Sequence, residues 1–250
     1  MSVLFVLTIL LAIGCIFAGM GLNSAVKPAG GAQSIGSVVG ATLGLVAFML
    51  AFTFNLAANR FDVRKQLLLE EVNAIGTAYL RAELLPKPFG ADVRRLLREY
   101  VDLRVRGVQD PRTLEEVIVK SEAIQEKLWL NVVNMSTAQP VTPVQNLFIR
   151  SLNEVIDLQT KRVTVGLRYR IPGTIWTGLY LISALAMVAV GYQSGPVKRR
   201  QYPVNIVLAL AFASVILLIA DLDRESEGTI LVSQQPILSL QQRLHASPDN

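Results

Sequence analysis

The fold is decided by residues 35–86, IGSVVGATLGLVAFMLAFTFNLAANRFDVRKQLLLEEVNAIGTAYLRAELLP. The first part, residues 35–57, contains no charged side chain and is long enough to cross the ~30 Å hydrocarbon core of a bilayer as a helix. The second part places lysines, arginines and glutamates among regularly spaced leucines, and no helix breaker precedes Pro86. We therefore expect one helix that leaves the membrane and continues into water.

Three other apolar segments accompany this helix. They occupy residues 3–22, the interval between Arg170 and Lys198, and residues 203–220. The first segment has no basic residue before it and is longer than the apolar region of a cleavable signal peptide, so we expect a retained membrane helix. The sequence therefore predicts four membrane spans.

The composition supports a membrane protein and excludes several other classes. Apolar residues make up 52% of the chain and charged residues only 17%, against about 25% in an ordinary soluble domain. The net charge of +5 comes from bases interleaved with acids, so we expect no nucleic-acid partner. A single cysteine, Cys15, and a single histidine, His245, exclude a disulfide framework, a Cys/His metal cluster and a histidine-based triad. No nucleotide-loop or hydrolase motif occurs, so we expect neither an enzyme nor a cofactor.

Residues 59–171 are different, with 18 Lys/Arg and 14 Asp/Glu, a net charge of +4. Their apolar residues recur at helical spacing rather than in strand-like alternation. Asp110–Pro111 and Thr142–Pro143 are typical helix starts, with an N-cap followed by proline at the first helical position. We expect four helical pieces: the continuation of the second span up to Pro86, residues 91–106 ending at Gly107, a helix from Pro111 to residue 138, and one from Pro143 to residue 168.

The predicted fold is thus an all-α membrane protein with a helical insert between the second and third spans. We assign residues 1–58 to the first two membrane helices, 59–171 to a cytoplasmic helical domain, 172–221 to the last two membrane helices and 222–250 to a cytoplasmic C-terminal tail.

Basic residues near the membrane favour a cytoplasmic insert. Eight lie on the side of the insert and both termini: Arg60, Arg64, Lys65, Lys161, Arg162, Arg168, Arg170 and Arg224. Four lie on the opposite side: Lys27, Lys198, Arg199 and Arg200. Because cytoplasmic loops carry the excess of Lys and Arg, both termini and the insert are expected in the cytoplasm.

The second span carries a regular stripe of residues on one helical face. The members are Gly36, Gly40, Gly44, Phe48, Phe52, Asn55 and Asn59. One interpretation is ordinary packing, in which glycines let helices approach and the phenylalanines fill a core or face lipid. The other is a pore helix, in which Phe48 and Phe52 form an apolar neck around a symmetry axis, with Gly40, Gly44, Asn55 and Asn59 lining or packing beside it.

At this stretch the sequence resembles a known family. Residues 47–62, AFMLAFTFNLAANRFD, are similar to the second membrane helix of bestrophin anion channels, with Phe48 and Phe52 in the neck and Asn59, Arg60 and Phe61 as a following motif. The continuation RKQLLLEEVNAIGTAYLRAELLP and the closing run DLDRESEGTILVSQQPIL resemble bacterial membrane proteins with a bestrophin-like domain. Two departures are Gly44, where a bestrophin neck has a third bulky apolar residue, and Phe61 in place of Trp.

The resemblance implies a homopentamer in the bilayer of a bacterial inner membrane, with an axial pore through which chloride passes passively. Two alternatives stay open from the residues alone. One is a non-conducting scaffold or sensor whose insert binds an unidentified cytosolic partner. The other is a cation channel of the same architecture, because one acidic ring in a vestibule would reverse the selectivity.

Two acidic groups have competing interpretations. Asp221, Asp223, Glu225 and Glu227 follow the last span, where eukaryotic bestrophins hold calcium. The spacing D-x-D-x-E-x-E lacks the glycine and distal glutamate of an EF-hand loop, and Arg224 sits among the acids, so a solvated helix end or partners for basic residues is favoured over a calcium site. Glu70 and Glu71 lie beyond Phe52 on the same long helix. They either line a cytoplasmic vestibule or pair with arginines such as Arg81, Arg94 and Arg98.

Overall fold

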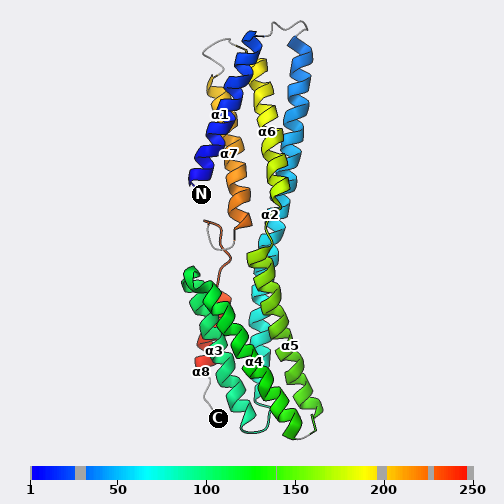
Figure 1. The fold of residues 1–250 in the computed structure, drawn as a ribbon, viewed down its shortest axis with the longest axis vertical. Helices are drawn as coiled ribbons and strands as arrows, with labels where there is room; N and C mark the ends of the chain where they lie inside the picture. Colours follow the sequence, from blue (N-terminus) through cyan, green and yellow to red (C-terminus); the bar gives the residue numbers. More distant parts are fainter. Residues whose placement is uncertain (1, 26–31, 139, 196–201, 225–227, 247–250) are drawn as a thin grey trace. The chain divides into compact units, whose positions relative to one another are not determined.

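A computed structural model describes residues 2–25, 32–138, 140–195, 202–224 and 228–246, and these residues contain helices and no strand. The α-helices are α1 (Ser2–Ala25), α2 (Ala32–Ala82), α3 (Phe89–Gln109), α4 (Leu114–Ala138), α5 (Pro143–Val163), α6 (Gly173–Ser194), α7 (Tyr202–Asp223) and α8 (Gln235–Ala246) (Figure 1). A short 3₁₀ turn (Pro111–Thr113) precedes α4, and a π-helical turn (Thr164–Arg168) follows α5. The predicted all-α class is confirmed.

The chain divides into two compact units. The first contains residues 1–61 and 170–231, and the second contains residues 62–169 and 232–250. Four helices of the described chain, α1, α2, α6 and α7, are long and apolar enough to cross a membrane. The α2 segment Ile35–Ala82 has 48 residues, about 72 Å of helix, more than twice the ~30 Å hydrocarbon thickness. Only its apolar first part therefore crosses the bilayer, and the charged remainder belongs to the second unit.

In the first unit, α1 and α6 are in backbone contact through glycine. A Cβ atom added to Gly19 would collide with the carbonyl of Val188, and one added to Gly191 would collide with the carbonyl of Ile16. Ile16, Leu179, Met187 and Ile216 form part of the surrounding apolar core. Within the first unit, the glycines in backbone contact with another helix are thus Gly19 and Gly191, whereas a Cβ atom added at Gly40 or Gly44 of the α2 stripe has no neighbouring atom of the described chain within 4 Å.

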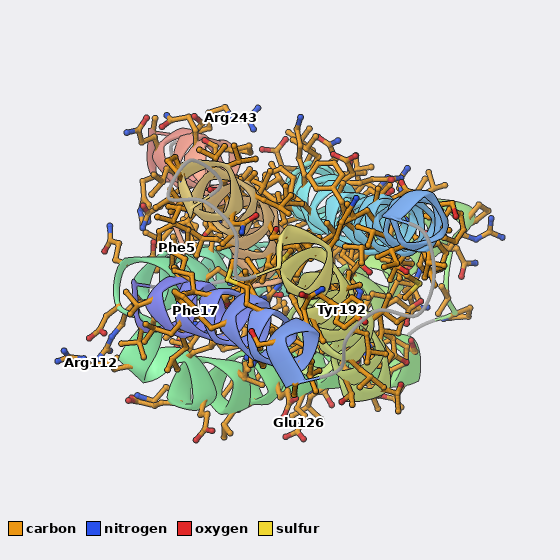
Figure 2. The ribbon with its side chains drawn as sticks, turned by 90° about the horizontal axis from the view of Figure 1, so that it is seen from above. Phe5, Phe17, Arg112, Glu126, Tyr192 and Arg243 are labelled. Atoms are coloured by element: carbon orange, nitrogen blue, oxygen red, sulfur yellow. The ribbon has the colours of Figure 1, made fainter. Side chains whose placement is uncertain are left out.

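In the second unit, α2, α3, α4, α5 and α8 enclose a core of large apolar side chains. Fully buried members include Ile75, Leu97, Tyr100, Leu128, Phe148 and Ile237. Charged side chains such as Arg112 and Glu126 project outward (Figure 2), while Glu71 and three arginines, Arg64, Arg94 and Arg104, are buried. The apolar core holds these five helices together.

Both predicted helix starts in this unit are confirmed. The side chain of Asp110 accepts a hydrogen bond from the backbone N–H of Arg112, 3.1 Å away, before the 3₁₀ turn that leads into α4. Thr142 and Gln145 form a reciprocal capping box at the start of α5, with side-chain to backbone distances of 3.2 and 2.8 Å. Each cap satisfies backbone donors that the first helical turn leaves open.

Several helix ends differ from the sequence-based expectation. Helix α2 ends at Ala82 rather than at Pro86, and α5 is α-helical only to Val163. Helix α3 continues through Gly107 to Gln109, because a single glycine weakens a helix without ending it, and Val117 packs 3.1 Å from where a Cβ atom of residue 107 would be. The C-terminal segment contains α8, which was not predicted. Its residues Ile237, Leu240 and Leu244 are buried in the core of the second unit.

Candidate functional site

From Gly40 onward, the predicted stripe of α2 lies on a face that the rest of the described chain leaves uncovered, whereas Gly36 is partly buried and a Cβ atom added there would lie 3.3 Å from the side chain of Gln193. Phe48 and Phe52 are 66% and 47% exposed, and Asn55 and Asn59 are exposed as well. No atom of the described chain lies within 4 Å of a Cβ atom added at Gly40 or Gly44. The opposite face of the helix is covered and buries Val39, Val46, Thr53 and Ala57. The two phenylalanines are therefore not part of the core of a single chain.

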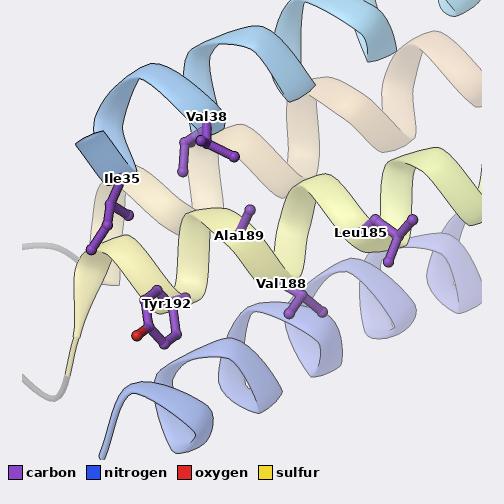
Figure 3. Close-up of a pocket in the computed structure, with 7 residues that line it drawn as sticks. Ile35, Val38, Leu185, Val188, Ala189 and Tyr192 are labelled. Atoms are coloured by element: carbon purple, nitrogen blue, oxygen red, sulfur yellow. The ribbon is translucent and has the colours of Figure 1, made fainter. Parts of the chain in front are cut away.

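Helices α2 and α6 enclose an apolar groove of about 420 Å³ near the start of α2. Its lining residues are Ile35, Val38, Val39, Leu185, Val188, Ala189 and Tyr192 (Figure 3). Val38 is 62% exposed beside this groove. The groove thus lies between α2 and α6, and its edge at Val38 is open to the surroundings of the chain.

The Asn59–Arg60–Phe61 motif connects α2 to α7 inside the first unit. The Nη1 atom of Arg60 donates to the Asp223 carboxylate at 3.1 Å, and the backbone N–H of Ile171 donates to the same carboxylate at 3.1 Å. Phe61 packs against the apolar cluster around Ile171, while Asn59 faces outward. One side of the motif therefore anchors α2 and the other stays on the uncovered stripe.

The first aspartate of the acidic run, Asp221, holds the segment after α7. Its carboxylate accepts hydrogen bonds from the backbone N–H groups of Thr229 and Ile230, at 2.9 and 3.0 Å, and from the Thr229 hydroxyl. Gly228 packs directly against this carboxylate. Asp221 and Asp223 thus have protein donors around them, while Glu225 and Glu227 lie outside the described residues. Within the described ranges, no group of three or more His, Cys, Asp or Glu side chains is arranged to hold a metal ion.

Glu71, one of the two glutamates expected to face a vestibule or pair with arginine, is completely buried in the second unit. Arg104 of α3 binds its carboxylate with two parallel hydrogen bonds of 3.0 Å. Arg162 of α5 approaches to 3.1 Å, and the Tyr100 hydroxyl donates at 3.1 Å. We name these four residues the Glu71 cluster. Three separate helices meet in it, so it fixes α2 against α3 and α5.

The arginine partners expected for Glu71 were wrong. The side chain of Arg81 donates instead to the carbonyl of Leu147, that of Arg94 pairs with Glu83, and that of Arg98 donates to the Tyr79 hydroxyl. Glu70, the neighbouring glutamate, is exposed and accepts a hydrogen bond from Gln66 at 2.8 Å.

The surroundings of the Glu71 cluster shift the pKa values of Glu71 and Tyr100 in opposite directions. Burial by itself opposes ionisation of Glu71, but the charges and hydrogen bonds of Arg104 and Arg162 outweigh it and lower the pKa of Glu71 to about 2. Burial and the adjacent Glu71 carboxylate raise the pKa of Tyr100 above its ordinary value. Glu71 is consequently ionised and Tyr100 is a neutral hydrogen-bond donor at physiological pH.

Comparison with known proteins gives consistent results. A family model described as the bestrophin-like domain matches residues 3–237. A crystal structure of a bacterial bestrophin homolog from Klebsiella pneumoniae, phased by Zn-SAD, superposes with a TM-score of 0.68 at 15% identity, over 97% of this chain and 96% of that one. A tyrosine-to-alanine variant of the Klebsiella homolog gives 0.67 at 16% identity, over 96% of each chain.

A crystal structure of a membrane protein with a proline-to-alanine substitution gives a TM-score of 0.70 at 15% identity, over 97% of this chain and 96% of that one. No curated protein matches the sequence. At these identities the superpositions establish a shared fold over nearly the whole chain.

Proposed function

The chain belongs to the bestrophin-like family, and from this membership we propose that it forms an ion channel whose axial pathway is lined by α2. The family consists of channel-type membrane proteins, in agreement with the expectation that the chain is not an enzyme. The multi-pass character follows from the four apolar helices.

The uncovered stripe of α2 is the observation that carries this proposal. A membrane helix with exposed glycines, phenylalanines and asparagines needs a surrounding that one chain does not provide. In a closed ring of copies the stripes of all α2 helices would face one axis. Phe48 and Phe52, one helical turn apart, would then form an apolar neck that gates by its width and wettability. Asn55 and Asn59 would follow the neck with amide groups.

We propose chloride as the permeant ion. Residues 59–171 carry a net charge of +4, which raises the local concentration of anions. The edges of phenylalanine rings are also positive and suit a passing anion. Exposed Glu70 on the same helix favours the second candidate, a cation channel of the same architecture.

The assembly that fits this pathway is a homopentamer in a bacterial inner membrane, with both termini and the second unit in the cytoplasm. The side chain of Arg60 and the apolar contacts of Phe61 hold the cytoplasmic end of the span in place. Each copy would contribute one α2 stripe to the axis and turn its α1 and α7 toward lipid or neighbouring copies.

Two measurements on one preparation test the proposal. Protein in nanodiscs is weighed by native mass spectrometry, and the same protein in liposomes is assayed for reversal potential under a chloride gradient. We expect a homo-oligomer and a reversal potential whose sign shows that chloride permeates more readily than the cation. A reversal potential of the opposite sign would replace the chloride assignment with the cation alternative. A stable monomer without flux would support the scaffold alternative and refute the channel.

A further inference from the structure

In the second unit, more positively charged than negatively charged side chains are buried. The side chains of Arg64, Arg94 and Arg104 are at most 7% exposed, and Glu71 is the one acidic residue of the described part of this unit that is buried. Arg162 is nearly buried, with 12% of its side chain exposed. Within the Glu71 cluster, two arginines face one carboxylate, so the cluster in each chain carries a net charge of +1.

The position of this charge along the chain is informative. Glu71 directly follows Glu70, whose side chain is on the exposed face of α2 together with those of Gln66 and Asn73. Successive residues of a helix are separated by about 100°, and a helix with its side chains is about 10–12 Å across. The Glu71 cluster therefore lies about one helix diameter behind the exposed face of Gln66, Glu70 and Asn73, which continues the helical spacing of Asn55 and Asn59 along α2.

Burial makes such a charge effective over this distance. Salt screens exposed charges strongly beyond about 8–10 Å, whereas buried charges are screened much less. The charge is also fixed in place, because Arg104 donates two hydrogen bonds to the Glu71 carboxylate and Arg162, on a third helix, donates one at 3.3 Å. In a ring of copies the contribution is repeated around the axis in each subunit.

We propose that the Glu71 cluster is a selectivity determinant. Its one surplus positive charge per subunit, buried behind the pathway-facing side of α2, raises the permeability to anions relative to cations. This inference rests on the proposed function. Arg162 is the determining residue, since the Glu71–Arg104 pair is neutral without it. Glu71 acts in the opposite direction, because it cancels half of the arginine charge.

Charge can be separated from structure by a matched set of variants. Arg162→Gln removes the positive charge and leaves the bidentate Glu71–Arg104 pair in place. Arg162→Lys keeps the charge but loses the planar donor geometry of the guanidinium. Glu71→Gln removes the negative charge and raises the net charge of the cluster. Arg162→Gln and Glu71→Gln both weaken the same ion pair, so a purely structural effect would act on both in the same direction.

The experiment measures reversal potentials of the full-length protein in liposomes under a sodium chloride gradient at low ionic strength. We expect Arg162→Gln to lower the anion-to-cation permeability ratio, Glu71→Gln to raise it and Arg162→Lys to leave it near that of the wild type. If Glu71→Gln does not fold, the Gln and Lys variants at position 162 still decide the question.

Three results would overturn the inference while leaving the channel intact. The permeability ratio could shift equally in Arg162→Gln and Arg162→Lys, it could shift in the same direction in Arg162→Gln and Glu71→Gln, or it could stay unchanged in all three variants. A wild-type protein that carries no ion flux would overturn the proposed function, and this inference with it.

Discussion

Phe48 and Phe52 differ from the buried apolar residues of the membrane unit because no other part of the described chain covers them. Truncating an exposed side chain leaves no internal cavity, so Phe48→Ala and Phe52→Ala should change the stability of the chain by no more than about 0.5 kcal/mol. A wider and less apolar neck should increase ion flux. Thermal unfolding and flux in liposomes, measured on the same preparations, check this prediction.

Leu179→Ala is the matched control for these variants. Leu179 is fully buried in the core of the membrane unit, so its truncation should cost about 2–5 kcal/mol and leave the conductance of the surviving channels unchanged. Phenylalanine variants that lose as much stability as Leu179→Ala and gain no flux would remove Phe48 and Phe52 from the pathway.

Local sequence patterns were sufficient to predict helix caps, but not to predict which side chains form ion pairs between distant helices. The N-caps Asp110 and Thr142 were predicted, because a cap depends on residues within one turn. The partner of Arg60 is Asp223, 163 residues away, and the second partner of Glu71 is Arg162, 91 residues away. Such pairs depend on how the helices are placed in space, which no local pattern specifies.

At the scale of elements, glycine allows α1 and α6 of the first unit to come into backbone contact. Gly191→Ala would place a methyl group against the Ile16 carbonyl, and we expect this overpacking to cost about 1–3 kcal/mol. Gly40→Ala makes the same chemical change in α2, where a Cβ atom meets open space. Because alanine is the better helix former, Gly40→Ala should be neutral or slightly stabilising for the folded chain.

Thermal unfolding of the two alanine variants in detergent checks this contrast. Equal destabilisation would mean that the α2 stripe is packed as tightly as the α1–α6 contact, contrary to the arrangement described above. The sequence drew attention to Gly36, Gly40 and Gly44 because they are regularly spaced. The glycines in helix contact, Gly19 and Gly191, lie in different helices, so no spacing within either segment could identify them as a pair.

Helix α8 shows a related gap between pattern and structure. Ile237, Leu240 and Leu244 have the spacing of one helical face and are buried, so the pattern needed to predict a helix was present. Its contacts lie on α3, where Gln241 and His245 both reach the Asp102 carboxylate, at 2.7 and 2.9 Å. A segment of 12 residues is too short for its own core, and its docking depends on the remainder of the second unit.

For the whole molecule, the acid stability of the second unit depends on Glu71. The pKa of Glu71 is about 2 in the folded chain, against an ordinary value of 4.5. A carboxyl whose pKa is lowered by folding stabilises the folded chain at pH values above its pKa in the unfolded chain. This contribution disappears as the pH falls from about 4.5 toward 2. At 1.36 kcal/mol per pKa unit the loss is about 3 kcal/mol.

Thermal unfolding as a function of pH checks this prediction, with Glu71→Gln as the control. The variant should be less stable than the wild type at neutral pH, because two buried arginines lose their counter-charge. The difference between the two proteins should shrink as the pH falls below 4.5. A difference that stays constant down to pH 2 would mean that Glu71 is not the ionised centre of the cluster.

The number of spans and the helical insert were predictable from the sequence because hydropathy and helical spacing are properties of one chain. What surrounds the uncovered stripe of α2 was not, because that surface is completed outside a single chain. The Asn55 and Asn59 side chains, for example, have the same local sequence whether they face lipid, a second copy or water.

The central claim is that the α2 stripe faces a water-filled pathway, and cysteine accessibility tests it most directly. In a Cys15→Ala background, Phe52→Cys and Leu181→Cys each introduce one thiol at an exposed position of a membrane helix, since Leu181 of α6 is 59% exposed. A charged, membrane-impermeant thiol reagent reacts with the thiolate, which forms in water and not in hydrocarbon. We predict that the reagent modifies Phe52→Cys and blocks its ion flux while Leu181→Cys stays unmodified and fully conducting. Flux through Phe52→Cys that persists with the thiol unmodified would contradict the claim that α2 lines the pathway.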